Sequence, residues 1–465
     1  MASIASSLRR IKDDPLGVLG REAVERVCRE HHVAWRERQL DPATTVALFI
    51  QQVLHGNAPC GEVRHLAAAA SAAASCSCSC PSAAFTAQAY CAARARLPLA
   101  VYQALLTDVQ QRLAPQTRHH EHLWHGHRTF HIDGSTFSMP DTPALREAFG
   151  MPPSQREGCG FPMAHLLVLF NAATGMLIGC WASPLRAGDL AETPEAHRHL
   201  DAGDVLIGDD TFSGYPHLAG LVGRGLHGLF PAHHLRIVSF AKNRPHNARG
   251  AKPVAGRPTS RWIESLGKHD QLVEYFKPGQ KPKRMSRAAY DALPDSVVVR
   301  ELRRTVTRPG LGTVTITLVT TLLDPVAYPA ADLLELRLRR WDVESNLGHL
   351  KTTMGMDVLR CRSEPGVRKE LAVFALVYNL VRAVMLEAAR RQEVPVRRVS
   401  FADAYRWLRH ARPGDVLPPL IVNPRRADRI EPRCKKRRPK QYDLMNQPRD
   451  QLRELLKKQR ETSLS

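Results

Sequence analysis

Three acidic residues, Asp133, Asp209 and Glu344, have carboxylates that can converge on one site. Asp133 and Asp209 each close an apolar run predicted to be a strand, and Glu344 lies on a later predicted helix. Hard divalent ions such as Mg²⁺ take oxygen ligands, and carboxylates from several elements can hold two ions about 4 Å apart. Such ions support in-line displacement at phosphorus. Any single Asp after a strand is more often a turn or helix cap.

Basic residues surround Glu344 at helical spacing. Apolar residues recur over residues 332–356 and predict one long helix. On that helix Arg340, Glu344 and Lys351 stand at offsets of four and seven, which places them on one face. The face can carry a metal ligand together with phosphate contacts. An ordinary surface ion pair between Arg340 and Glu344 is the alternative interpretation.

The elements that must position these residues alternate between strands and helices. Strands are predicted at residues 129–133, 164–172, 175–182 and 204–210, and helices at residues 193–200, 217–224, 332–356 and 367–385. The turn at residues 171–175 makes the second and third strands a hairpin. This order predicts a mixed α/β core.

The regions around this core have a different character. Residues 46–54 and 101–113 carry apolar side chains at helical spacing, so the first part of the chain is predicted to be helical. Residues 236–325 are rich in Pro, Lys and Arg, and the β-branched runs at 296–299 and 313–321 predict a β-rich insertion. After Pro413 the chain is predicted to be loop-like and basic.

Composition indicates a large globular protein that binds a polyanion. The chain has 465 residues, 43% hydrophobic and 24% charged, with a formal net charge of +21. The basic excess is concentrated, with 17 Lys and Arg against 7 Asp and Glu in residues 236–325 and 17 against 8 in residues 403–465. Nucleic acid is the commonest partner for such a balance. A run of nine basic residues between Arg425 and Lys440 is expected to follow backbone phosphates without reading bases.

Other sequence features exclude some protein classes. No uninterrupted apolar stretch is long enough to span a membrane, and the first 20 residues lack the apolar block of a secretory signal, so a cytoplasmic protein is expected. The C-x-C-x-C run at Cys76, Cys78 and Cys80 lacks a second pair of zinc ligands at finger spacing. A histidine-rich stretch is more often a solvated or phosphate-facing surface than a metal site. It contains His119, His120, His122, His125, His127 and His131.

Three segments resemble the motifs of bacterial insertion-sequence transposases of the DDE class. Residues 124–142 are similar to the first catalytic motif, with Asp133 as its Asp. Residues 204–215 are similar to the second, Asp-Arg-x-Phe, with Asp209 aligned through Phe212. Residues 337–351 resemble the Tyr-Arg-Glu-Lys signature of the insertion sequence four family, where Arg340, Glu344 and Lys351 match at the family spacing. The likeness continues at residues 41–57, 352–361, 368–382 and 431–440 and covers nearly the whole chain.

Two positions depart from the family pattern. Arg337 stands where the signature has Tyr, and Asp210 stands where the second motif has Arg. A guanidinium at 337 still binds phosphate well, because it forks onto two oxygens. Asp210 adds a negative charge beside the expected metal ligand Asp209.

The resemblance implies a multidomain α/β protein that performs cut-and-paste DNA transposition. The implied divisions are residues 1–120 for an N-terminal helical DNA-binding domain, 121–235 and 329–412 for two parts of an RNase H-like core, 236–328 for the β-rich insertion, and 413–465 for a basic C-terminal region. The implied working ion is Mg²⁺, for which Mn²⁺ can substitute, held by Asp133, Asp209 and Glu344. The implied DNA-contacting residues are Arg337, Arg340, Lys351, Lys435, Lys436, Arg437 and Arg438.

The implied partners are DNA, as terminal inverted repeats and as target, and a second copy of the chain in a synaptic homodimer. No membrane is involved, and the expected location is the bacterial cytoplasm at the nucleoid. Two alternatives stay open. One is a DNA-binding relative that has lost catalysis, and the other is a metal-dependent nuclease of the same fold without strand transfer.

Overall fold

The computed structural model describes most of the chain. The described residues are 20–73, 85–153, 156, 158–248, 252, 254–283, 285–308, 312–411, 415–424 and 444–462. The basic run that holds Lys435, Lys436, Arg437 and Arg438 lies outside them, and so does the cysteine run at 76–80.

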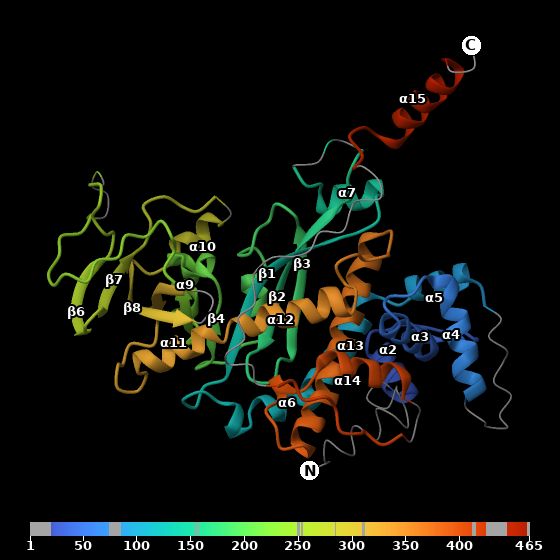
Figure 1. The fold of residues 1–465 in the computed structure, drawn as a ribbon, viewed down its shortest axis with the longest axis horizontal. Coiled ribbons are helices and arrows are strands. Elements are labelled where there is room, and N and C mark those ends of the chain that lie inside the picture. The colour runs from blue at the N-terminus through green and yellow to red at the C-terminus, as the bar shows by residue number, and fades with distance from the viewer. Residues whose placement is uncertain are drawn as a thin grey trace.

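The described part of the chain forms a mixed α/β fold around one large sheet (Figure 1). The sheet has nine strands in the order β3-β2-β1-β4-β5-β9-β8-β7-β6. The strands are β1 (Thr129–Ser138), β2 (Met163–Asn171), β3 (Leu177–Pro184), β4 (Val205–Ile207), β5 (His227–Pro231), β6 (Arg261–Gly267), β7 (Asp270–Phe276), β8 (Ser296–Arg308) and β9 (Gly312–Thr320). Strands β1, β4 and β5 are parallel, and the other neighbouring pairs are antiparallel.

The predicted hairpin is present as β2 and β3. Asn171 ends β2, and its side-chain oxygen accepts a hydrogen bond from the Thr174 backbone at 2.9 Å. Gly175 then takes a φ of +69°, a left-handed conformation that glycine adopts without a Cβ penalty. Strand β2 is buried along almost its whole length, because helices cover both faces of the sheet there.

Strands also occur in the region rich in β-branched residues. β9 pairs antiparallel with β5, so strands β6 to β9 extend the same sheet rather than forming a separate one. In Figure 1 they make the yellow-green end of the molecule, away from the blue N-terminal helices.

The other regular elements of the described residues are helices. They are α2 (Arg21–Glu30), α3 (Pro42–Leu54), α4 (Cys60–Ala73), α5 (Ala87–Arg96), α6 (Leu99–Thr117), α7 (Pro143–Phe149), α8 (Thr193–His197), α9 (Tyr215–Gly223), α10 (Arg287–Asp291), α11 (Ala330–Leu338), α12 (Trp341–Gly348), α13 (Glu364–Arg391), α14 (Phe401–His410) and α15 (Arg449–Thr462). Short 3₁₀ turns lie at η1 (His120–His122), η2 (Asp210–Ser213) and η4 (Val396–Arg398), and η3 (His349–Thr353) is a π turn.

Helix α13 is the centre of the larger core. Among the described residues it is the one helix long and apolar enough to cross a membrane, but its apolar window is wholly buried within the protein. It packs against α3, α6 and α14 and against β3. The N-terminal helices therefore share a continuous hydrophobic core with the sheet.

Polar contacts fix the N-terminal helices onto this core. Asn57 donates to the buried carboxylate of Glu370 on α13 at 2.6 Å. The Tyr405 hydroxyl on α14 donates to the carbonyl of Leu54, the last residue of α3, at 2.7 Å. Because buried polar groups are costly when unpaired, these contacts select one docking arrangement.

Three sequence expectations need correction. The single helix predicted over 332–356 is three segments, α11, α12 and η3, because the chain breaks at Arg339 and Arg340, where no Gly or Pro marks the sequence. Asp133 does not close its strand, since β1 continues to Ser138. The C-terminal region is not loop throughout, since α15 is a helix that projects from the body in Figure 1. Its charged residues are good helix formers, which composition alone did not distinguish from loop.

Candidate active site

Strand β1 carries Asp133 into the interior of the molecule. Strand residues alternate between faces, so Asp133 shares a face with His131 and Ser135. Its side chain is 14% exposed. Burial raises the pKa of Asp133 to about 6, the Arg340 guanidinium opposes the rise, and repulsion from Asp209 adds to it. His131 is fully buried rather than solvated, and burial followed by nearby arginines lowers its pKa to about 3, so it is neutral.

Asp209 reaches the same edge of the sheet from β4. β1 and β4 are parallel and paired with His131 opposite Ile207, so Asp133 and Asp209 each lie two residues beyond the same pair on neighbouring segments. Asp209 caps η2 by accepting a hydrogen bond from the Thr211 backbone at 2.9 Å. Burial, and then repulsion from Asp189 and Asp210, raises its pKa. Phe212 anchors the turn in the core, as the sequence alignment requires.

Arg340 connects Asp133 to Glu344. One guanidinium nitrogen lies 3.4 Å from Asp133 Oδ2, and the other lies 3.3 Å from Glu344 Oε1. The Arg340–Glu344 ion pair of the alternative interpretation is therefore present. The same guanidinium also spans two carboxylates that are 211 residues apart in the sequence, which a surface pair does not do.

Arg337 is the second guanidinium of the site. It is largely buried in the last turn of α11, and burial followed by repulsion from Arg340 lowers its pKa to about 10. The negative charges of Asp209, Asp133 and Glu344 act in the opposite direction. Its buried Nε has no hydrogen-bond partner within the described residues. Arg337 is thus a charged group that interacts electrostatically with the three acids and keeps one unpartnered N–H within the described residues.

Lys351 reaches the site from the π turn after α12. Its ammonium donates to Ser135 Oγ at 3.0 Å, and Ser135 lies two residues beyond Asp133 on the same face of β1. The structure therefore brings together six of the residues singled out in the sequence. They are Asp133, Asp209, Arg337, Arg340, Glu344 and Lys351.

Asp189 is a participant that the sequence motifs did not reveal. Its charge raises the pKa of both Asp133 and Asp209, so a fourth carboxylate lies near the cluster. The His165 ring on β2 holds it at 2.6 Å. Asp189 packs against Gly134, the residue after Asp133, where a Cβ would come within 1.8 Å of its carboxylate oxygen. Asp189 lies in the loop after β3, and this loop comes close to Asp133 only in the folded protein.

Asp210, the other departure from the family pattern, has partners of its own. His234 lies with Nδ1 at 3.1 Å from Asp210 Oδ2 and its backbone N–H at 3.4 Å. Burial pulls the pKa of Asp210 upward, but the two hydrogen bonds from His234 outweigh it and leave the pKa below its ordinary value. The extra acid beside Asp209 is therefore ionised and held by hydrogen bonds from His234.

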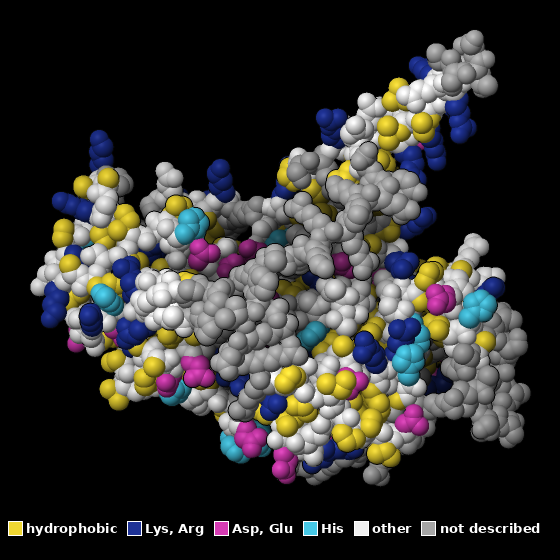
Figure 2. All heavy atoms as spheres, in the orientation of Figure 1, with side chains coloured by type: hydrophobic (Ala, Val, Ile, Leu, Met, Phe, Trp, Pro, Cys, Tyr) yellow, Lys and Arg dark blue, Asp and Glu magenta, His cyan; other side chains and the backbone are white. Residues whose placement is uncertain are grey.

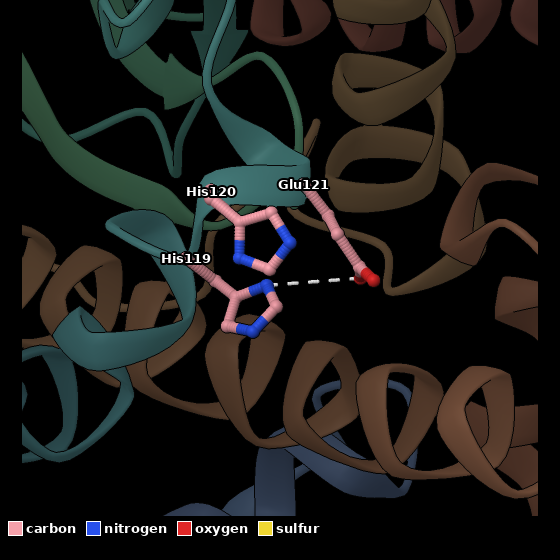
Figure 3. A group of neighbouring side chains, drawn as sticks. All are labelled: His119, His120 and Glu121. Carbon is pink, nitrogen blue, oxygen red and sulfur yellow. Dashed lines mark ion pairs between the residues drawn. The ribbon is translucent and has the colours of Figure 1, made fainter.

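The histidine-rich stretch forms a separate cluster. His119, just before η1, lies beside His120 and Glu121 within it, and all three are exposed (Figure 3). His119 Nδ1 is 3.7 Å from a Glu121 oxygen. Exposure agrees with the expectation of a solvated surface.

The active-site donor set fits hard divalent ions. Carboxylates from β1, the turn after β4 and α12 lie around the guanidiniums of Arg340 and Arg337, and burial is the main cause of the raised pKa values of Asp133 and Asp209. A guanidinium bridges two of the acids where a cation is favoured.

Comparison with known proteins gives the family. A family model described as "Transposase DDE domain" matches residues 124–380, more than half of the chain. The chain belongs to the transposase DDE domain family. Transposase InsG of insertion sequence element IS4 from Escherichia coli K12 is 26% identical over 369 residues, which cover 75% of this transposase and 76% of InsG. These findings confirm the likeness to the insertion sequence four group.

Two further similarities are more limited. The putative transposase InsZ of Escherichia coli K12 is 36% identical over 78 residues, or 17% of this transposase and 25% of InsZ. A cryo-EM structure of the piggyBac transposase synaptic complex with hairpin DNA has a TM-score of 0.39 at 11% identity, covering 88% of this chain and 80% of that one. By its family, this transposase is an enzyme of DNA transposition that cleaves DNA and transfers strands with divalent metal ions.

The close packing of Asp189 against Gly134 predicts that a larger residue at position 134 destabilises the transposase. Gly134→Ala puts a methyl group 1.8 Å from the Asp189 carboxylate oxygen and 3.3 Å from His165 Nε2, so the Asp189–His165 contact must break. We expect a loss of about 1 to 3 kcal/mol in the free energy of unfolding, measured by urea denaturation.

Gly220→Ala is the matched control, since a Cβ at Gly220 meets no atom within 4 Å and this residue lies inside α9. It should be neutral or slightly stabilising. Equal stability of the two variants would show that Asp189 moves without cost.

Proposed function

We propose that Asp133, Asp209 and Glu344 bind the divalent ions of this transposase, with Mg²⁺ as the working ion and Mn²⁺ as a substitute. The bridging of Asp133 and Glu344 by Arg340, 3.4 and 3.3 Å away, is the observation that carries the proposal. It supports the proposal because Asp133 and Glu344 share one guanidinium, which a bound ion would replace as their counter-charge. Bound ions would activate the attacking oxygen and stabilise the leaving oxygen at the scissile phosphate.

The basic residues act on the DNA phosphates. Asp133 and Glu344 would hold the cations, and the Arg340 guanidinium that now pairs with them would be available to phosphate. Arg337, whose charge interacts with the same three acids, would fork onto phosphate oxygens. Lys351, held by Ser135, supplies a point charge beside them.

The catalytic core is proposed to be RNase H-like. The strand order β3-β2-β1-β4-β5, with an antiparallel meander followed by two parallel strands, supports this assignment. We divide it into residues 121–235 and 329–412, with the insertion at 236–328 and the basic region at 413–465. The helices of residues 1–120 are proposed to bind DNA, and their shared core with α13 would couple that binding to the sheet.

The substrate is proposed to be the terminal inverted repeats of an insertion sequence together with target DNA, handled by a synaptic homodimer in the bacterial cytoplasm. Lys435, Lys436, Arg437 and Arg438 would contact phosphates without base specificity.

Product analysis tests this function against its alternatives. DNA carrying the element's inverted repeats is incubated with the transposase and Mg²⁺, and nicked and joined products are quantified separately. Both products are expected, and both should disappear with chelator. Nicking without joining would favour a nuclease, and binding without either product would favour a catalytically silent relative.

Lys351 gives a prediction that separates catalysis from metal binding. Lys351→Ala removes a charge-assisted contact to phosphate worth about 1.5 to 3 kcal/mol, so cleavage and strand transfer should both fall by about 10- to 100-fold. Mn²⁺ binding without DNA, followed by electron paramagnetic resonance, should be unchanged. Lys351→Arg should recover part of the activity.

Arg198→Ala is the control for losing one positive charge, because Arg198 pairs only with Glu195 beside α8 among the contacts seen. Its activity should match that of the unmodified protein. Transposition by Lys351→Ala at that same level in a cell-based mobility assay would contradict the phosphate contact.

A further inference from the structure

A second group of possible metal ligands lies beside the carboxylate site. Asp210, His233 and His234 each offer a ligand atom, and these atoms all lie within 4.8 Å of one another. The group differs in chemistry from the active-site acids, since it has two imidazoles and one carboxylate. Two nitrogens and an oxygen favour transition metals such as Zn²⁺ over Mg²⁺.

The fold builds this group from two neighbouring strands. Asp210 begins the turn η2 after β4, and the two histidines follow β5. β4 and β5 are parallel neighbours, so both segments leave the sheet at the same edge. Residues 23 positions apart in the sequence therefore face one another without any shared motif.

The side chains are already arranged around a common point. His234 Nδ1 lies 3.1 Å from Asp210 Oδ2, and the His233 and His234 rings stack with centroids 4.3 Å apart. The Leu235 backbone N–H donates to His233 Nδ1 at 3.2 Å, so binding through that nitrogen exchanges one hydrogen bond for a metal bond. These hydrogen bonds limit the rotation of the His233 and His234 rings.

The group is open to solvent on one side. The His234 side chain is 71% exposed and the Asp210 side chain 35%. Figure 2 shows acidic and histidine side chains together at the rim of a hollow on the face in view. Three protein ligands with an open side are the pattern of exchangeable or catalytic zinc sites, whereas structural sites are closed by four.

We propose that Asp210, His233 and His234 form a transition-metal site of the Zn²⁺ class, adjacent to and distinct from the carboxylate cluster. A divalent ion there places positive charge next to Asp209, at the edge of the site where two neighbouring carboxylates repel each other. This site does not depend on the catalytic roles proposed for Asp133, Asp209 and Glu344.

Zinc titration of the full chain tests the site. The protein is stripped with chelator, excess Mg²⁺ is added to occupy oxygen-rich sites, and Zn²⁺ binding is measured by calorimetry. The chain has ten cysteines that can also bind zinc, so zinc binding is compared between variants that keep all ten cysteines. His233→Gln/His234→Gln should lose one equivalent of zinc, and Asp210→Asn should weaken the same equivalent by at least about tenfold.

The exposed cluster of Figure 3 provides the matched control. His119→Gln/His120→Gln removes two surface histidines of another possible metal-binding group and should keep the equivalent in question. Melting temperatures should be equal for the two double variants without zinc. Unchanged stoichiometry and affinity in His233→Gln/His234→Gln would overturn the proposal. Loss in the His119→Gln/His120→Gln protein alone would also overturn it and assign the zinc to η1.

Discussion

Asp133→Asn, Asp209→Asn and Glu344→Gln are each expected to abolish DNA cleavage while leaving binding to end DNA nearly intact. An amide keeps the shape of the side chain but loses the negative charge that holds a divalent ion. Because such ions contribute several kcal/mol to the transition state, the cleavage rate should fall by roughly 10³-fold or more. Cleavage of radiolabelled end DNA and gel-shift binding on the same preparations separate the two effects.

An acid outside the cluster controls for general loss of charge. Asp141 follows β1 and pairs with Arg146 at 2.5 Å on the surface, so Asp141→Asn should cleave normally. Asp210→Asn should be mild compared with Asp209→Asn. Full activity in any one of the three main variants would remove that residue from the metal-binding set. If Asp210→Asn were inactive and Asp209→Asn active, the second metal ligand would be Asp210 rather than Asp209.

The second prediction concerns stability. Asp133→Asn should abolish cleavage but stabilise the metal-free protein at neutral pH. Asp133 has a pKa of about 6 in the fold, against an ordinary value of 3.8, mainly because it is buried. The folded protein therefore holds this proton more tightly than the unfolded chain, and the ionised carboxylate destabilises the fold. At about 1.4 kcal/mol per pKa unit, the penalty is about 2 to 3 kcal/mol.

The pH dependence identifies the cause. The penalty is absent below the unfolded pKa near 4, grows as the pH rises toward 6, and is complete above 6. Urea denaturation in chelator should find Asp133→Asn more stable by about 2 kcal/mol at pH 7.5 and equal to the unmodified protein at pH 4. Saturating Mg²⁺ should remove the advantage, since it stabilises only the protein with the carboxylate. If Asp133→Asn were less stable than the unmodified protein at pH 7.5, the ion pair between Asp133 and Arg340 would stabilise the fold by more than burial of the carboxylate destabilises it.

Much of the local structure is determined by the sequence itself. Two apolar segments flanking turn residues identify the β2–β3 hairpin, and helical spacing identifies α3, α6 and α13. These signals are local because the side-chain periodicity of an element depends only on its own residues. The motifs around Asp133, Asp209 and the signature helix likewise identify the family, since each is a short contiguous pattern.

Contacts between distant segments were decided only by the tertiary structure. The break between α11 and α12 lets Arg340 join Asp133 to Glu344, yet no breaker residue marks it. Asp189 reaches the acids because β1 has a glycine, Gly134, where any Cβ would collide with it. The pairing of Asp210 with His234 depends on β4 and β5 ending at one edge.

Burial explains why these contacts escape sequence patterns. The charge state of Asp133 and the unpartnered Nε of Arg337 are set by how much water the surrounding helices exclude. That quantity depends on packing among segments up to 200 residues apart, such as β1 and α11. The sequence by itself determined which residues carry the chemistry, and the tertiary structure decided which of them meet, because strand order and helix packing are settled by long-range burial rather than by local periodicity.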